Sequence, residues 1–283
     1  QYLDFGIMQD EFGFVLRGFW ETLQLSLISG ALALVSFADD WRGLPSLLRL
    51  ATHLLAALAL VYYMMPDLAL PLAALLVLAI VWSTNLYNFM DGADGIAGGM
   101  TLIGFGAYSA AAWTAGDATL AWFAASVSAA AAAFLRYNFH PARIFLGDVG
   151  SIPLGFLAAA IGVYGWYSEY WPAWFPLLTF SPFIVDATLT LAQRAARGER
   201  FWQAHREHYY QRLVRMGLGH RRTALAEYAL MAAAGIFAVL LLHAPAYMQQ
   251  LALAAWAATY LALAAIVNRK WASYAAGEHD DSD

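Results

Sequence analysis

The sequence predicts an all-α protein that crosses a lipid bilayer several times. Hydrophobic residues make up 61% of its 283 residues and charged residues only 12%, against about 25% charged residues in soluble domains. Long apolar runs recur along the chain and are separated by short polar segments, as expected of transmembrane helices. Nearly all of the basic residues fall on one side of the resulting topology. The chain has no cysteine, which excludes disulfides and thiolate chemistry.

Each apolar run is bounded by residues that turn or end a helix. Residues 1–20 mix aromatic and acidic side chains, so we expect them at the membrane interface rather than across the bilayer. Pro66-Asp67 and Gly116-Asp117 supply turns between later runs. The seventh run contains Pro176 and Pro182 and should therefore be bent or broken. The nine expected spans cover roughly residues 22–37, 47–65, 68–82, 96–113, 120–135, 152–164, 174–192, 224–242 and 250–267.

The domain organisation that follows is simple. Residues 1–267 form a single integral membrane domain, and residues 268–283 form a polar cytoplasmic tail that we expect to be disordered because it ends in acidic residues. With nine spans, alternate connections lie on opposite sides of the membrane. One side then holds every one of the 15 lysines and arginines except Arg17. The positive-inside rule makes that side cytoplasmic.

Three acidic clusters share this cytoplasmic side. Asp39-Asp40 closes the first span, where negative charge at a helix C-terminus favours a compensating cation. The run Asn85–Gly95 contains two amides, two carboxylates and two glycines, and its simpler interpretation is a solvated turn. Asp148, in Gly147–Ser151, opens the sixth span and could merely cap that helix. Together the clusters offer the hard oxygen ligands with which Mg²⁺ and substrate phosphates bind.

The longest polar stretch, residues 193–222, is basic and contains His205-Arg206-Glu207-His208. A zinc site would need a third ligand at a clear spacing, so an anion-binding role together with Arg194 fits better. Contact with anionic lipid headgroups is the simpler alternative. The chain has no nucleophilic cysteine and no G-x-S-x-G motif. The pattern therefore indicates phosphoryl transfer at a membrane surface.

In order and spacing these motifs resemble the polyprenyl-phosphate N-acetylhexosamine-1-phosphate transferases, glycosyltransferase family 4. The matching pieces are Asp39-Asp40, the N-x-x-N-x-x-D-G-x-D-G run at Asn85–Gly95 and the F-L-G-D-x-G-S run at Phe145–Ser151. The resemblance covers roughly residues 30–245. The segment Arg197–Leu213 is similar to the O-antigen-initiating branch and lacks the three consecutive histidines of the muramoyl-pentapeptide branch.

The resemblance implies an Mg²⁺-dependent enzyme of the bacterial inner membrane, with Mn²⁺ as a substitute metal and the active site facing the cytoplasm. It would transfer N-acetylhexosamine-1-phosphate from a UDP-sugar to undecaprenyl phosphate, releasing UMP, in the synthesis of a cell-surface polysaccharide of the O-antigen type. A homodimer is compatible with this role, and no nucleic acid is expected. The implied catalytic residues are Asp39 and Asp40, and the implied metal ligands are Asp148 and Asn88. The implied nucleotide-sugar contacts are Asn85, Asp91, Asp94, Phe145, His205, Arg206 and His208, with further phosphate contacts from Gly147, Ser151 and Arg194.

Three alternatives accompany this expectation. The family pattern has two further helices before Asp39-Asp40, and we expect both to be missing from this chain. A truncated, non-catalytic membrane protein is therefore one alternative, and a UDP-GlcNAc-specific enzyme of the same family is another. A transporter would need acidic residues within its spans, for which Asp186 is the candidate.

Overall fold

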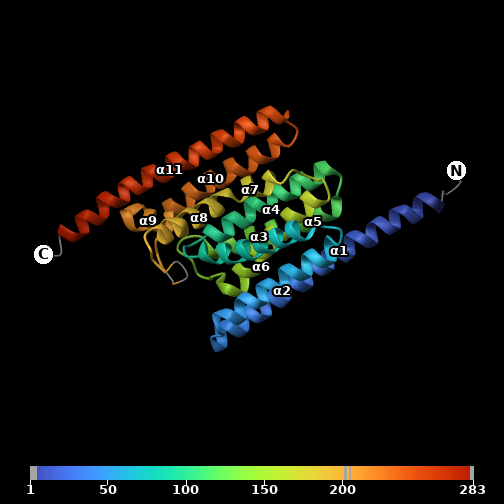
Figure 1. Cartoon of the computed structure of the whole chain (residues 1–283), viewed down its shortest axis with the longest axis horizontal. Helices are drawn as coiled ribbons and strands as arrows, with labels where there is room; N and C mark the ends of the chain where they lie inside the picture. The colour runs from blue at the N-terminus through green and yellow to red at the C-terminus, as the bar shows by residue number, and fades with distance from the viewer. Residues whose placement is uncertain (1–4, 201–202, 204, 281–283) are drawn as a thin grey trace.

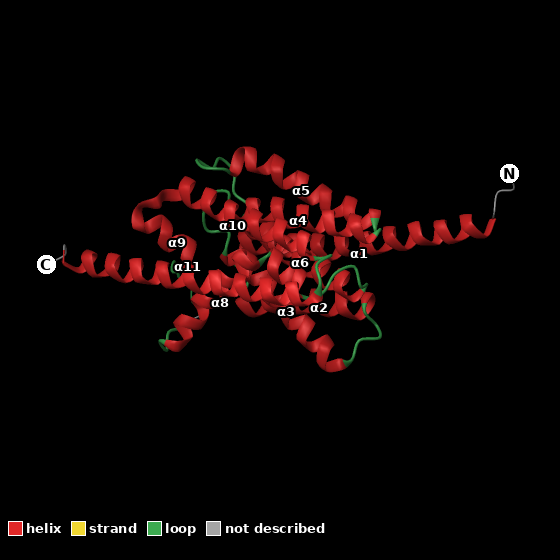
Figure 2. Cartoon of the chain, turned by 90° about the horizontal axis from the view of Figure 1, so that it is seen from above, coloured by secondary structure: helices red, strands yellow, loops and turns green. Residues whose placement is uncertain are grey.

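The computed structural model describes residues 5–200, 203 and 205–280, and within this part of the chain it contains helices and loops but no strand (Figures 1 and 2). The α-helices are α1 (Phe5–Arg42), α2 (Ser46–Met64), α3 (Leu70–Phe89), α4 (Ile96–Ala115), α5 (Ala118–Asn138), α6 (Gly147–Tyr167), α7 (Trp174–Thr179), α8 (Ser181–Ala196), α9 (Tyr209–Leu213), α10 (Gly219–Leu241) and α11 (Ala246–Asp280). A short π-helix, η1 (Val214–Leu218), joins α9 to α10. In Figure 1, α1 and α2 lie along one flank of the bundle and α10 and α11 along the other.

Seven segments of the described chain are long and apolar enough to cross a membrane. They lie in α1, α2, α3, α5, α6, the α9–α10 region and α11. The predicted all-α, polytopic membrane fold is confirmed, but the count of nine spans is not. The two expected spans outside the seven are α4 and the region of α7 and α8.

The seventh expected span is broken, as its prolines predict. It forms two helices, α7 and α8, which meet at Phe180. Pro182 lies in the first turn of α8, where its missing N–H group removes no helical hydrogen bond. The break allows α8 to carry Asp186 to the same end of the bundle as α9.

Both ends of the described chain are helical. Residues 5–20 belong to α1, which runs without interruption from Phe5 to Arg42 and projects beyond the bundle (Figure 2). The part of α1 that is long and apolar enough to cross a membrane begins at Trp20, and the interfacial position of the residues before it stays a prediction. The expected disorder of the tail is wrong up to Asp280, because these residues extend α11. Ala-rich sequence continues past Asn268 and favours helix. Residues 281–283 lie outside the described part of the chain.

Close packing of α3 against α6 sets the position of the polar residues. A Cβ added to Gly155 would lie 2.7 Å from the Ser83 carbonyl oxygen, so only glycine allows this approach. The Ser83 hydroxyl donates to the Gly155 carbonyl at 3.0 Å. The two helices are thereby fixed in register, with the last turn of α3 beside the first turn of α6.

Candidate active site

The centre of the candidate site is a contact between α3 and α6. The Asn88 side-chain amide donates to Asp148 Oδ1 at 2.7 Å. The chain enters α6 through Gly147, whose φ of 62° is readily adopted only by glycine. The N-cap residue, Leu146, makes no side-chain cap bond, and Asp148 lies inside the first turn. Asp148 is therefore oriented by Asn88 and is not a helix cap.

Asp39 and Asp40 come from the last turns of α1 and have different surroundings. Asp39 is buried, and its two carboxylate oxygens accept from the Leu44 backbone N–H at 2.6 Å and from Arg49 Nη1 at 3.1 Å. Asp40 is exposed and lies beside Gly147, where an added Cβ would be 3.8 Å from Asp40 Oδ2. Asp39 is thus fixed by the protein, whereas Asp40 is open to a ligand.

Arg49 on α2 links Asp39 to Asp148. Its Nη1 atom is 3.1 Å from Asp39 Oδ2 and 3.8 Å from Asp148 Oδ2, and its side chain is 42% exposed. A guanidinium held in this way still has N–H groups available for a phosphate. The sequence pattern did not identify Arg49, because one arginine near the start of an apolar helix is typical of any cytoplasmic helix end.

Asp91 lies in the short loop between α3 and α4. Its burial, and then the negative charge of Asp148, raise the pKa of Asp91 to about 7, although a hydrogen bond from the Gly147 backbone opposes the rise. Near neutral pH its carboxyl group is therefore divided between the protonated and ionised forms. A cation bound beside Asp148 would favour the ionised form.

The carboxylates at this end of the bundle suit a hard divalent cation. We call Asp39, Asp40, Asp91 and Asp148 the carboxylate wall. In the part of the chain that the structure describes, no group of three or more His, Asp or Glu side chains is arranged to hold a metal by itself. Mg²⁺ usually takes only one or two carboxylates and completes its shell with water and substrate phosphates. The donor set around Asp148 fits a cation shared with a substrate.

Asp94 joins two loops of the site. Its Oδ2 atom is 2.7 Å from His140 Nδ1 and accepts from the Ala142 backbone N–H at 3.2 Å. Although burial opposes the change, these hydrogen bonds lower the pKa of Asp94. Asn138 adds a second link, since its side-chain oxygen accepts from the Gly95 backbone N–H at 3.1 Å. The α5–α6 loop is therefore held against the α3–α4 loop, and the nucleotide contact expected of Asp94 stays a prediction.

The histidine segment reaches the same place from the other side of the bundle. The His208 ring stacks on Phe89 with centroids 6.2 Å apart, and the His205 ring lies 4.8 Å from that of His208. The Tyr210 hydroxyl donates to the Phe89 carbonyl at 3.1 Å. The structure thus brings the two predicted histidines to the end of α3. We call Asp186, His205, His208 and Arg212 the histidine wall.

Arg194, expected at a phosphate, lies in a network of ion pairs. It contacts Glu207 and lies 2.9 Å from Glu199 Oε2. Arg197 contacts the same two carboxylates, at 2.5 Å and 2.6 Å. The network ties together the two ends of the loop between α8 and the histidines. The guanidinium of Arg194 is therefore paired with protein carboxylates, and its predicted phosphate contact stays a prediction.

The other predicted contact residues fall into two groups. Phe145 and Arg206 are exposed, with Phe145 at 75%. Ser151 is buried in α6, and Asn85 donates to its own helix at the Val81 carbonyl, 2.7 Å away. Phe145 and Arg206 can therefore contact a ligand directly, whereas Ser151 is buried and the Asn85 amide is bonded within its own helix. Arg212 and Asp186, which the motifs did not place in the site, are described below.

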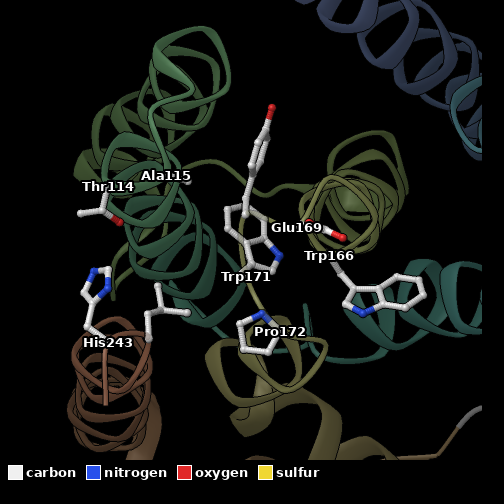
Figure 3. Close-up of a pocket in the computed structure, with 9 residues that line it drawn as sticks. Thr114, Ala115, Trp166, Glu169, Trp171, Pro172 and His243 are labelled. Carbon is white, nitrogen blue, oxygen red and sulfur yellow. The ribbon is translucent and has the colours of Figure 1, made fainter. Parts of the chain in front are cut away.

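A cavity of about 440 Å³ lies at the opposite end of the bundle, near the C-terminal ends of α4 and α6. Figure 3 shows Trp171 in the middle, with Thr114 and His243 on one side of it and Glu169 on the other. Its polar groups do not converge on one point, so it lacks the arrangement of the carboxylate wall.

Fold and site together define a multi-pass membrane protein with a cluster of carboxylates, bridged by Arg49, at one end of its helix bundle. A family model described as glycosyl transferase family 4 matches residues 22–166, which is just over half of the chain. The chain belongs to this family.

Individual relatives agree with the family. A probable undecaprenyl-phosphate N-acetylglucosaminyl 1-phosphate transferase of Bacillus subtilis is 33% identical over 156 residues, covering 54% of this chain and 44% of that protein. A phospho-N-acetylmuramoyl-pentapeptide-transferase of Anoxybacillus flavithermus is 31% identical over 166 residues, covering 50% of this chain and 51% of the relative. A protein of the same name from Moorella thermoacetica is 50% identical over 91 residues, covering 32% of this chain and 27% of that protein. The matches thus extend over about half the length of the first two relatives.

Proposed function

We propose that this protein transfers N-acetylhexosamine-1-phosphate from a UDP-sugar to undecaprenyl phosphate and releases UMP. The observation that carries the proposal is the meeting of the three family motifs at the start of α6. Asn88 donates to Asp148, and Arg49 connects Asp148 to Asp39. The printed names of the relatives describe transferases of this kind.

The reaction needs charge neutralisation more than it needs a base. An oxygen of the lipid phosphate attacks the β-phosphorus of the UDP-sugar, and the bond from that phosphorus to the bridging oxygen breaks, so that UMP leaves with the electron pair. A phosphomonoester has a second pKa near about 6, so the attacking phosphate is already mostly a dianion at neutral pH. Positioning and electrostatic stabilisation should supply most of the rate enhancement.

The structure suggests separate roles for the two adjacent aspartates. Asp39 is occupied by Arg49 and the Leu44 backbone, so it orients Arg49 rather than acting as a base. Arg49 would then bind the lipid phosphate with its remaining N–H groups. Asp40 is exposed beside Gly147 and would face the diphosphate and its cation.

The residues around Asp148 fit the Mg²⁺ that the family resemblance implies. Asp148 would hold the ion, and Asn88 would keep the carboxylate turned toward it, as outer-shell partners do in metal sites. When bound, Mg²⁺ would neutralise charge on the diphosphate. Phe145 and Arg206, both exposed, are available to the nucleotide and sugar.

The setting of the proposed reaction is the bacterial inner membrane. The loops that carry the site also carry the basic residues, which supports a cytoplasmic location by the positive-inside rule. The product would be an undecaprenyl-diphosphate sugar used to build a cell-surface polysaccharide. UDP-GlcNAc is the first donor to test because of the Bacillus subtilis relative, and the O-antigen role stays a prediction.

The test measures UMP release by purified protein with undecaprenyl phosphate, Mg²⁺ and a panel of UDP-N-acetylhexosamines. We expect release with one donor, loss without Mg²⁺, and loss in Asp40→Asn and Asp148→Asn. Asp67→Asn is the matched control, because Asp67 is exposed at the opposite end of the bundle and should not affect turnover. Near-wild-type turnover in Asp148→Asn would overturn the site. Absence of UMP release with every donor would overturn the function.

A further inference from the structure

A buried carboxylate, Asp186, organises the histidine wall without belonging to any of the family motifs. It lies on α8 and is only 7% exposed. It accepts hydrogen bonds from the Tyr209 and Tyr210 backbone N–H groups at 2.9 Å and 3.0 Å and from the Thr190 hydroxyl at 3.2 Å. Its fourth partner is the side chain of His208, at 3.2 Å. The contacts with Tyr209, Tyr210 and His208 fix the chain where α9 begins, whereas the Thr190 contact lies within α8.

The charge of Asp186 suits this position. The first N–H groups of a helix have no partners within the helix and carry partial positive charge. Asp186 satisfies two of those groups at the start of α9, although it comes from a different helix. A carboxylate in a membrane-embedded bundle is costly unless it is compensated in this way. The Asp186 carboxylate is therefore occupied by hydrogen bonds within the bundle, unlike the free acid that a transporter would use.

The contact with His208 also bears on which ring nitrogen carries a proton. A carboxylate can only accept, so the 3.2 Å contact of Nδ1 with Asp186 Oδ1 favours hydrogen on Nδ1, in competition with the Gln211 backbone N–H, which the His208 side chain faces in the capping box of α9. The other ring nitrogen, Nε2, is then the one left for a ligand. Stacking of the ring on Phe89 and on Tyr210, with centroids 6.2 Å and 6.0 Å apart, restricts its rotation. The orientation of the His208 ring is thus fixed, and its contact with Asp186 favours the Nδ1–H tautomer.

A second buried side chain supports the residue before His208. Arg212 is 2% exposed, and its Nε donates to the Glu207 carbonyl at 2.7 Å. Its Nη1 donates to Asn268 on α11 at 2.8 Å, and its guanidinium lies over the Trp271 ring, 5.8 Å from the centroid. The histidine segment is therefore held from α8 and from α11 at adjacent residues.

We propose that Asp186 is a positioning residue for the transfer reaction. It holds His208 in the Nδ1–H tautomer and presents Nε2 to the phosphate groups of the substrates. The proposal gives Asp186 no substrate contact, because its two carboxylate oxygens already make four contacts with the protein. The role in catalysis rests on the proposed function, whereas the link between Asp186 and the His208 tautomer can be tested without any turnover.

The first experiment observes the ring directly. Nitrogen-15 NMR of histidine-labelled protein in nanodiscs, with His208→Ala to assign the signal, reports which nitrogen carries hydrogen. We expect a protonated Nδ1 in the wild type and in Thr190→Val, which removes one contact of Asp186 but leaves the histidine in place. We expect that preference to be lost in Asp186→Asn. A wild-type ring with hydrogen only on Nε2 would overturn the proposal even if the Asp186 variant failed to fold.

The second experiment measures kinetics with the donor found in the UMP assay. Loss of an outer-shell partner of a functional histidine typically costs about 10–100-fold. We expect Asp186→Asn to lower kcat by about that factor with a smaller change in KM, Asp186→Glu to recover part of the loss, and Thr190→Val to match the wild type.

The double variant Asp186→Asn/His208→Ala should be no slower than His208→Ala alone. Losses that multiply in the double variant would show that Asp186 acts independently of His208, contrary to the proposal. A wild type that releases no UMP would refute the proposed function and leave the NMR result standing.

Discussion

The two walls of the site carry their charges in different ways. In the carboxylate wall four acidic side chains gather, and the basic side chain that bridges Asp39 and Asp148 is Arg49. In the histidine wall Asp186 accepts four hydrogen bonds, and Arg212 is surrounded by backbone, amide and aromatic partners. The first wall has an excess of negative charge, whereas the second is compensated within the protein.

This difference indicates that the two walls have different roles in the site. Crowded carboxylates repel one another, so the first wall gains stability when a cation or a cationic side chain is added. A wall whose hydrogen bonds are already made costs little reorganisation during a reaction and is suited to orienting a substrate. Variants of the carboxylate wall should therefore respond to ions, and variants of the histidine wall should respond to packing.

The largest effect is expected from Arg49, because it links the two helices that supply the acidic cluster. Arg49→Ala should lower kcat/KM for undecaprenyl phosphate by about 100-fold or more, since oriented charge is a large contributor to such reactions. Arg49→Lys should restore part of the activity, because lysine keeps the charge but not the paired geometry. Arg42→Ala is the control, since Arg42 lies over Trp41 and not at the cluster. An active Arg49→Ala enzyme would contradict this role.

The next effect tests how the walls meet. A Cβ added to Gly92 would be 2.2 Å from the Tyr210 hydroxyl, so Gly92→Ala should push α9 away from the end of α3. Overpacking of this kind costs about 1–3 kcal/mol, visible as a lower thermal midpoint and slower UMP release. The double variant Gly92→Ala/Tyr210→Phe removes the clashing oxygen and should recover most of the loss. No recovery would mean that the walls do not depend on this contact.

A smaller effect is expected from the titration of Asp91. Its folded-state pKa of about 7 is above the ordinary value, so the folded protein binds more protons than the unfolded chain between about pH 4 and pH 7. In EDTA, stability should therefore fall as the pH rises through this window. Asp91→Asn should flatten the fall, and Mg²⁺ should stabilise the wild type more than the variant at pH 7.5. The measurement is the thermal midpoint as a function of pH. Identical profiles for the wild type and Asp91→Asn would argue against a raised pKa at Asp91.

The smallest effect is expected at α11. Asn268→Ala removes one hydrogen bond to Arg212 and should cost about 1 kcal/mol of stability. Thr259→Ala on the same helix is the matched control, because the Thr259 hydroxyl bonds only to its own helix. Equal thermal midpoints for the two variants would show that α11 does not support the histidine wall.

Much of the site could be predicted from local sequence. Asp148 and Asn88 lie in compact motifs, and the structure places them within hydrogen-bonding distance. The simpler alternative for Asp148, a helix cap, was not found, and the Asn88 contact comes from another helix, so no sequence pattern reports it. Asp186 was noticed only as an acid within a span, since its partners lie in a different helix and loop.

The sequence by itself determined the fold class, the family and the set of polar segments that gather at one end of the bundle. Those conclusions depend on composition, on the length of apolar runs and on short motifs, all of which are local properties of the chain. Only the tertiary structure decided which carboxylates are free and which are occupied. It showed Asp39 held by Arg49, Asp94 held by His140, and Asp186 holding His208. The availability of a charged group depends on its neighbours in space, and helix packing brings those neighbours from distant parts of the sequence.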